Sequence, residues 1–342
     1  LEGNATGTGW ITQHLRDLPR MFRQLIKKYA IESSLLWGAC ALVLLLFPWV
    51  RIWTISQFEL AGFAPLLDQI RSLEKFAPVP LEQFLTYEGV VGLTFDEPIL
   101  LLCVLVWSIA RGSDVVSGEL GRGTMEMLLA QPVSRTQVMV AHAMVSVLGL
   151  ACLVLIAWCG LAIGIETNQV PISSQRWVPI PGMPISIPNF WSEAKTVHVP
   201  LSQFVSPSLY ITPSLNLFAL GLAVWGLSVL MSSWDQYRWR TIGLVLAVYV
   251  AQFLLFLLSK STPAFKPLVH GTFLAAYQPD WMVQVAAQEP QRVGDWWYGW
   301  VENAGIYSLG PLGFSAALIG LGVACWGIAL FLFSRRDLPA PL

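Results

Sequence analysis

Long apolar runs without charged residues constrain this chain more than any other feature of its sequence. A bilayer core requires about 20 consecutive, mostly apolar residues from each spanning helix. Five stretches meet this requirement: Ser33–Val50, Val138–Ile165, Ser214–Trp234, Thr241–Ser259 and Asn303–Ser334. They predict at least five membrane spans, because a water-soluble core seldom needs apolar helices of this length.

A sixth apolar run, Pro98–Ala110, has only 13 residues. The apolar stretch 89–95 could extend it outward. Alternatively, a helix begins at Pro98 with Asp96 as its N-cap and Glu97 near the positive end of the helix dipole, and continues past Arg111. Either interpretation gives a second span, and hence six in all.

Composition agrees with a membrane protein and excludes several other classes. Hydrophobic residues make up 55% of the 342 residues and charged residues 12%, about half of the roughly 25% typical of soluble domains. This argues against a soluble enzyme, a disordered chain or a nucleic-acid binder. The five cysteines are odd in number and form no CxxC pair, so neither a disulfide framework nor a thiolate metal site is predicted. We therefore expect an all-α polytopic membrane protein.

The distribution of basic residues predicts which side faces the cytoplasm. With six spans, both termini share one side, and that side carries 12 Lys and Arg against 8 on the other, whereas Asp and Glu number 8 against 13. The positive-inside rule places both termini in the cytoplasm, and we expect a multi-pass protein of the cytoplasmic or inner membrane. The predicted regions are 1–32 (cytoplasmic tail and interfacial helix), 33–110 (spans one and two), 111–137 (cytoplasmic connection), 138–234 (spans three and four), 235–334 (spans five and six) and 335–342 (cytoplasmic tail).

The segment Trp10–Tyr29 has the pattern of an amphipathic helix. Apolar residues recur at helical spacing, and five Lys or Arg residues occupy most of the remaining surface. Such a helix is expected to lie among lipid headgroups. The alternative is a juxtamembrane helix that packs on protein.

The three loops on the opposite side are long, namely 51–97, 166–213 and 260–302. Residues 170–213 are rich in Pro and Ser and predict strands and turns rather than helix. Trp296, Trp297, Tyr298 and Trp300 are typical of an interfacial aromatic belt, with a substrate-stacking surface as the alternative.

The cytoplasmic connection Ser113–Gln137 reads SDVVSGELGRGTMEMLLAQPVSRTQ. It predicts a polar helix end, a glycine-rich break and a short amphipathic helix that Thr124 caps and Pro132 ends. Met125, Leu128 and Leu129 would give this helix an apolar stripe. An apolar stripe on a cytoplasmic helix is expected to dock in a groove, either on another protein or in its own bundle.

At these residues the sequence resembles the permease subunits of ABC transporters, specifically the type-2 exporter permease family. The resemblance rests on Ser117-Gly118-Glu119, Gly123-Thr124, Glu126, Leu128-Leu129, Pro132-Val133-Ser134-Arg135 and the ending Phe333–Leu338. The chain departs from that pattern in two ways. Members often have Lys a few residues after the Pro-Val-Ser-Arg sequence, where this chain has His142, and the outer loops of this chain are longer.

The resemblance implies an ATP-driven exporter permease that forms the translocation path. It implies a second copy or paralogue as partner and a separate ATPase subunit that binds ATP. This chain has no phosphate-binding loop, and no catalytic, cofactor-binding or metal-binding motif is recognised in it. The residues expected to couple to the ATPase are Gly118, Glu119, Gly123, Thr124, Glu126, Leu128, Leu129, Pro132 and Arg135.

Several alternatives stay open at this point. The coupling residues could merely cap and orient helix ends, with Glu119 as an intramolecular cap. Asp96 and Glu97 could form an intramembrane acid pair in an ion- or proton-coupled carrier or channel. The long loops could instead recruit an extracytoplasmic partner to a membrane scaffold. Gly160 and Gly164 form a small-xxx-small pair that permits close helix approach, either within the chain or between copies.

Overall fold

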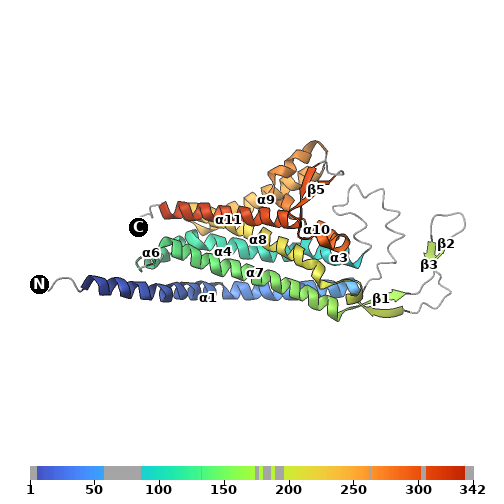
Figure 1. The fold of residues 1–342 in the computed structure, drawn as a ribbon, viewed down its shortest axis with the longest axis horizontal. Helices are drawn as coiled ribbons and strands as arrows, with labels where there is room; N and C mark the ends of the chain where they lie inside the picture. The colour runs from blue at the N-terminus through green and yellow to red at the C-terminus, as the bar shows by residue number, and fades with distance from the viewer. Residues whose placement is uncertain are drawn as a thin grey trace.

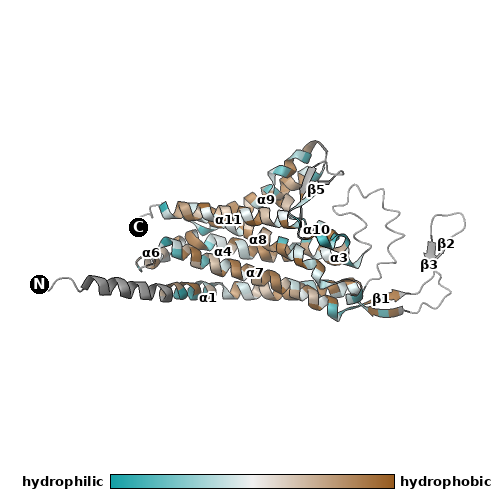
Figure 2. Ribbon diagram, in the orientation of Figure 1, coloured by the Kyte–Doolittle hydropathy of each residue, from teal (hydrophilic) through white to brown (hydrophobic). Residues whose placement is uncertain are grey.

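The computed structural model describes residues 6–57, 86–131, 133–173, 177–179, 186–188, 196–261, 263–301 and 306–335. Within these ranges six helical segments are long and apolar enough to cross a membrane. Figure 1 shows them side by side along the long axis of the molecule, and Figure 2 shows apolar residues along most of their length. The predicted all-α membrane fold with minor strand content is confirmed.

The six candidate spans contain the apolar runs that the sequence pattern identified, except for the first residues of the last run. They are Met21–Ser56, Tyr87–Gly121, Arg135–Thr167, Pro207–Trp234, Arg238–Ser261 and Pro311–Arg335. The principal helices are α1 (Thr6–Ser56), α4 (Pro98–Ser113), α7 (Arg135–Thr167), α8 (Ile211–Trp234), α9 (Arg238–Ser261) and α11 (Pro311–Arg335). The last span begins at Pro311 rather than at Asn303, because Ile306–Leu309 forms a strand.

Helix α1 differs from the expected separate interfacial helix. It runs from Thr6 to Ser56 without interruption, so the amphipathic segment and the first span are one element (Figure 1). Leu25 and Tyr29 are buried against Val138 and Ala141 of α7. These turns of α1 therefore pack on protein, as in the alternative of a juxtamembrane helix. Lys27 and Lys28 thus lie on a helix that continues into the bundle.

The second span begins earlier than Pro98 and is capped differently from the prediction. Helix α3 (Tyr87–Gly92) starts at the N-cap Thr86, and the 3-10 turn η4 (Leu93–Asp96) leads from it into α4. Glu97, not Asp96, occupies the N-cap position of α4, and its side chain makes no capping hydrogen bond. The helix begins at Pro98 as expected, since proline at the first helical position sacrifices no intrahelical donor.

Helix α8 lies at the centre of the bundle and packs most extensively against α11, and also against α4. The contact with α11 is close because glycines face each other: a Cβ at Gly322 would lie 2.5 Å from the Leu222 carbonyl oxygen, and one at Gly226 would overlap the Gly322 carbonyl. In the same way, Gly160 lies against the Leu45 carbonyl of α1. The Gly160–Gly164 pair therefore serves packing within the chain.

The opposite end of the bundle carries short elements. The paired strands are β1 (Gln169–Ser173) with β4 (Thr196–Pro200), β2 (Trp177–Pro179) with β3 (Ser186–Pro188), and β5 (Trp297–Val301) with β6 (Ile306–Leu309), all antiparallel. The helical elements here are η6 (Leu201–Gln203), η7 (Pro207–Tyr210), η8 (Pro263–Gly271), η9 (Phe273–Ala276), α10 (Pro279–Gln288) and η10 (Pro290–Arg292). Strands within 170–213 are thus confirmed up to Pro200, whereas the expectation of no helix was wrong for η6, η7 and the first residues of α8.

The close approach of α8 and α11 gives the first testable prediction. Replacing Gly322 by Val forces side-chain atoms against the α8 backbone and is expected to destabilise the protein by about 1–3 kcal/mol. Gly320→Val is the matched control, because nothing lies within 4 Å of a Cβ at Gly320 on the same helix. Reversible unfolding in mixed micelles measures the difference, and equal stabilities for the two variants would contradict the packing described.

Candidate functional site

The connection between the second and third spans is a continuous helical path with one sharp turn. After α4 come the π-helical turn η5 (Asp114–Gly118), α5 (Glu119–Gly121) and α6 (Thr124–Leu129). The turn falls at Gly123, whose φ of 70° lies in the left-handed region that glycine adopts without steric cost. The predicted glycine-rich break and short second helix are both present.

The π-helical turn is held by a side chain from the neighbouring helix. Ser232 of α8 accepts hydrogen bonds from the backbone N–H groups of Val116, at 3.3 Å, and Ser117, at 2.9 Å, and donates one to the Ser113 carbonyl. Thr241 of α9 donates to the Ser117 hydroxyl at 3.1 Å. Insertion of a side chain into the helical ladder is a recognised cause of such irregular turns, which frequently mark functional sites.

Asp114, on this turn, binds three arginines from different elements. Its Oδ1 lies 2.8 Å from Arg122 Nη1 and 3.3 Å from Arg238 Nη1 of α9, and its Oδ2 lies 3.4 Å from Arg111 Nη1 of α4. Asp114 and Arg111 are both buried. A buried carboxylate is tolerated only when opposite charges and hydrogen bonds compensate its lost hydration. We call Asp114 and these three arginines the Asp114 cluster.

Glu119 continues this ionic network into α1. Its side chain is fully buried, and its carboxylate lies 2.7 Å from Lys28 Nζ and 3.3 Å from Arg122 Nη2. Thr124 donates a hydrogen bond to the same carboxylate. Glu119 therefore ties the connection to its own bundle, which is the intramolecular role considered above, and it is not exposed for contact with another protein.

Arg122 lies between both carboxylates at the end of α5. Burial lowers the pKa of Arg122, but its hydrogen bond to Asp114 and the nearby acidic charges outweigh that effect, so the net shift is upward. The guanidinium is therefore a permanent cation bridging Asp114 and Glu119.

The Asp114 carboxylate occupies the space that a side chain at position 118 would fill, so this position is suited to glycine. A Cβ at Gly118 would overlap Asp114 Oδ1, whereas one at Gly121 would meet nothing closer than 4.0 Å. The first of these two glycines is thus required by the geometry of the Asp114 cluster.

Helix α6 has one buried side and one exposed side. Met125 and Leu128 are buried, and Leu128 packs in a cluster with Leu25 and Tyr29 of α1 and with α7. The predicted apolar stripe therefore docks in its own bundle. Two residues point outward: Glu126 is exposed, and Met127 is 69% exposed.

The remaining predicted coupling residues have mixed placements. Thr124 is the first residue of α6 and does not cap it, because the N-cap is Gly123 and makes no side-chain hydrogen bond. Arg135 begins α7 and donates to the Phe333 carbonyl of α11 at 3.1 Å. Leu129 ends α6, but its side chain lies outside the described residues, as does Pro132.

The predicted coupling residues do not include several residues of this site, namely Lys28, Arg111, Asp114, Arg122, Met127 and Arg238. Asp114 could have been suspected, because a carboxylate within three residues of Arg111 at the end of an apolar run needs a partner. No local pattern indicates that Lys28 and Arg238 reach the same network from distant parts of the chain.

At the other end of the bundle, Glu97 of the acid pair considered for a carrier is not free. Glu97 forms an ion pair with Arg51 of α1, and Arg51 also donates to the Thr94 hydroxyl at 3.0 Å. The described residues contain no group of three or more His, Cys, Asp or Glu that could hold a metal ion.

The Asp114 cluster gives a second prediction. Asp114→Asn keeps the side-chain shape but leaves buried Arg111 without its counter-ion, so a loss of about 3–5 kcal/mol in the free energy of unfolding is expected. The control is Asp295→Asn, which removes a half-exposed ion pair with Arg292 and is expected to cost less than about 1 kcal/mol. Unfolding titrations of both variants in mixed micelles measure the two losses, and a loss as small for Asp114→Asn as for Asp295→Asn would overturn the assignment.

Comparison with known proteins identifies the family. A family model described as "ABC-2 family transporter protein" matches residues 28–338, from the Lys28 that pairs with Glu119 to beyond the end of α11. No curated protein matches the chain. The matched range includes all six candidate spans apart from the first turns of Met21–Ser56. The chain belongs to the ABC-2 transporter family and is the multi-pass permease component of such a transporter.

Proposed function

We propose that the exposed side of α6 is the surface through which this permease binds its ATPase subunit. ABC transporters in general draw energy from ATP bound by an ATPase partner, and membership of the family makes such a partner expected here. The observation that carries the proposal is the two-sided character of α6: Met125 and Leu128 anchor it in the bundle, while Glu126 and Met127 project away from the bundle.

The proposed docking surface consists of an apolar centre and a charged neighbour. Met127 is a flexible, polarisable side chain of the kind that fills irregular grooves, and Glu126 adds an acidic group one position earlier. Among the predicted coupling residues, Gly123 forms the turn before α6, Leu129 is the last residue of α6, and Arg135 begins α7. Pro132 lies between α6 and α7 in the sequence.

Transmission into the bundle would run through the ionic network. Thr124 and Glu119 connect α6 to Lys28 of α1, and Arg122 connects it to Asp114, whose carboxylate occupies the space beside Gly118. A displacement of α6 would therefore move α1, α4 and α9 together, because moving one of these helices alone would separate buried opposite charges in the ionic network. These residues transmit the movement and do not contact the ATPase.

Orientation and assembly complete the proposal. The excess of basic residues on the side of α6 favours a cytoplasmic location for this element and for both termini. Helix α9 is little buried within the chain and exposes Leu246, Val250 and Leu257, which suits either lipid or a second permease copy or paralogue. Export is the direction implied by the resemblance of residues 117–135 to exporter permeases.

Charge and polarity changes on the exposed side of α6 test the docking surface. Glu126→Arg and Met127→Asp are expected to lower the amount of ATPase subunit that co-purifies by at least about tenfold, a loss typical of an interface anchor. Glu166→Arg is the control, because Glu166 is an exposed residue at the opposite end of α7. Co-purification from membranes measures the effect.

The folded permease should be unaffected in these variants, because both side chains point away from the core. Unchanged elution in size-exclusion chromatography checks this. Normal ATPase binding by correctly folded Glu126→Arg and Met127→Asp variants would refute α6 as the docking element.

A separate prediction concerns transmission. Gly118→Ala displaces the Asp114 carboxylate, whereas Gly121→Ala has open space. We expect Gly118→Ala to bind the ATPase subunit but to lose most of the substrate-stimulated ATP hydrolysis, and Gly121→Ala to behave as the unmodified protein. Hydrolysis by the reconstituted complex measures this, and equal stimulation in both variants would exclude the Asp114 cluster from the coupling path.

A further inference from the structure

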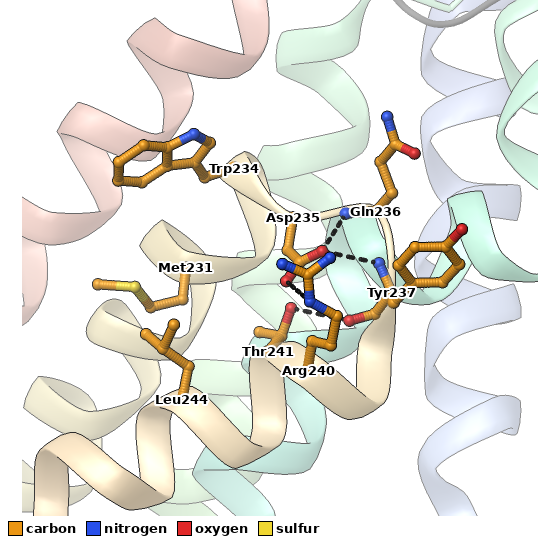
Figure 3. Close-up of a pocket in the computed structure, with 8 residues that line it drawn as sticks. All are labelled: Met231, Trp234, Asp235, Gln236, Tyr237, Arg240, Thr241 and Leu244. Carbon is orange, nitrogen blue, oxygen red and sulfur yellow. Dashed lines mark hydrogen bonds and ion pairs between the residues drawn. The ribbon is translucent and has the colours of Figure 1, made fainter.

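A cavity of about 500 Å³ lies where α8 ends and α9 begins. Figure 3 shows its lining: Met231 and Leu244 face each other across its apolar part, and Asp235, Tyr237 and Arg240 gather at its polar part. Gln236, Trp234 and Thr241 complete the wall. None of these residues belongs to the Asp114 cluster or to α6.

The position of the cavity along the bundle corresponds to the lipid headgroup region. The fourth span ends at Trp234 and the fifth begins at Arg238, so the turn between them is where the apolar part of both helices stops. Three exposed aromatic residues lie at this turn or at the start of α9: Trp234 is 78%, Trp239 72% and Tyr237 53% exposed. Exposed Trp and Tyr at the ends of spans are typical of residues that sit among lipid headgroups.

The polar part of the cavity contains the guanidinium of Arg240, and its ion pair with Asp235 uses only one of its N–H donors. Asp235 accepts hydrogen bonds at Oδ1 from the backbone N–H groups of Gln236, at 2.7 Å, and Tyr237, at 3.1 Å. Its Oδ2 lies 3.4 Å from Arg240 Nε. This ion pair leaves the two Nη groups with four further N–H donors. The Arg240 side chain is 56% exposed, and a guanidinium binds phosphate oxygens in a bidentate fashion.

We propose that this cavity binds an anionic phospholipid. The phosphate would bind the Arg240 guanidinium, and the start of an acyl chain would lie against Met231 and Leu244. The match is of charge and of shape: beside its ion pair with Asp235, the Arg240 guanidinium has further N–H donors next to an apolar wall at headgroup depth. The proposal does not depend on the coupling role of α6.

Binding of the ATPase subunit is the main competing use of this turn, because it lies at the same end of the bundle as α6 (Figure 1). The cavity favours lipid instead, because its apolar residues, Met231 and Leu244, belong to the spans themselves rather than to a projecting loop. The test therefore measures lipid binding and binding of the ATPase subunit separately.

The experiment uses the full chain in vesicles of equimolar phosphatidylglycerol and phosphatidylcholine. The protein is solubilised and purified, and the lipids that remain bound are quantified by mass spectrometry. The unmodified protein is expected to retain phosphatidylglycerol preferentially, and Arg240→Gln to lower that preference about fivefold, because the phosphate loses the guanidinium donors that would bind it inside the cavity. The control is Arg335→Gln, which removes an exposed cation that lies over Phe331 at the end of α11 and should leave the preference unchanged.

A second variant tests the apolar part and remains informative if Arg240→Gln fails to fold. Leu244→Trp fills the cavity without changing charge, and a severalfold loss of retained phosphatidylglycerol is expected. Soluble glycerol phosphate is not expected to displace the lipid, because it lacks the acyl chain that contacts Met231.

Three results would overturn the proposal. The first is an unchanged lipid preference in folded Arg240→Gln, or an equal loss in Arg335→Gln. The second is displacement of the lipid by glycerol phosphate, which would indicate a free-phosphate site. The third is loss of the co-purifying ATPase subunit in Arg240→Gln with normal lipid retention, which would make the cavity a protein-docking site.

Discussion

The buried carboxylate of Asp114 is the constraint on which the arrangement of this end of the bundle depends. An ionised side chain at the end of a membrane span is costly unless it is paired, and here three arginines from separate elements provide the opposite charge. Because Arg111 belongs to α4 and Arg238 to α9, the cluster determines how these helices meet. The buried carboxylate of Glu119 likewise needs a cation, and its pairing with Lys28 connects α1 to the same end of the bundle.

This network explains why a short connection can be rigid. Helix α6 has only six residues, far too few to be stable as an isolated helix. It persists because Met125 and Leu128 are buried, because Gly123 permits the sharp turn before it, and because Glu119 and Arg122 attach the preceding turn to the bundle. A rigid element that exposes two side chains is better suited to transmit a movement than a flexible loop of the same length.

Much of the fold could be predicted from sequence, because membrane spans are a local property. Apolar length found five of the six spans, and the short run Pro98–Ala110 gave the second span only with its flanking residues. The Gly-rich break and short helix between Gly118 and Arg135 followed from local residue preferences. Pairing across the chain could not be predicted. Lys28 and Glu119 are 91 positions apart, and no periodicity relates them. The apolar stripe of α6 was visible, but only the packed bundle shows that it faces α1 and α7 and leaves Met127 outside. The expected cap at Asp96 was wrong because η4 continues to that residue and moves the cap to Glu97.

The π-helical turn at Asp114–Gly118 has a mechanical consequence. A π-turn contains about one residue more than an α-helical turn, because its hydrogen bonds join residues i and i+5. If the turn became α-helical, everything after it would rotate by about 100° and advance by about 1.5 Å along the axis. The hydroxyl of Ser232, which bonds three backbone groups of this region, opposes that change. The second span thus contains a turn whose change to α-helix would rotate and shift α6, which follows it after the three residues of α5.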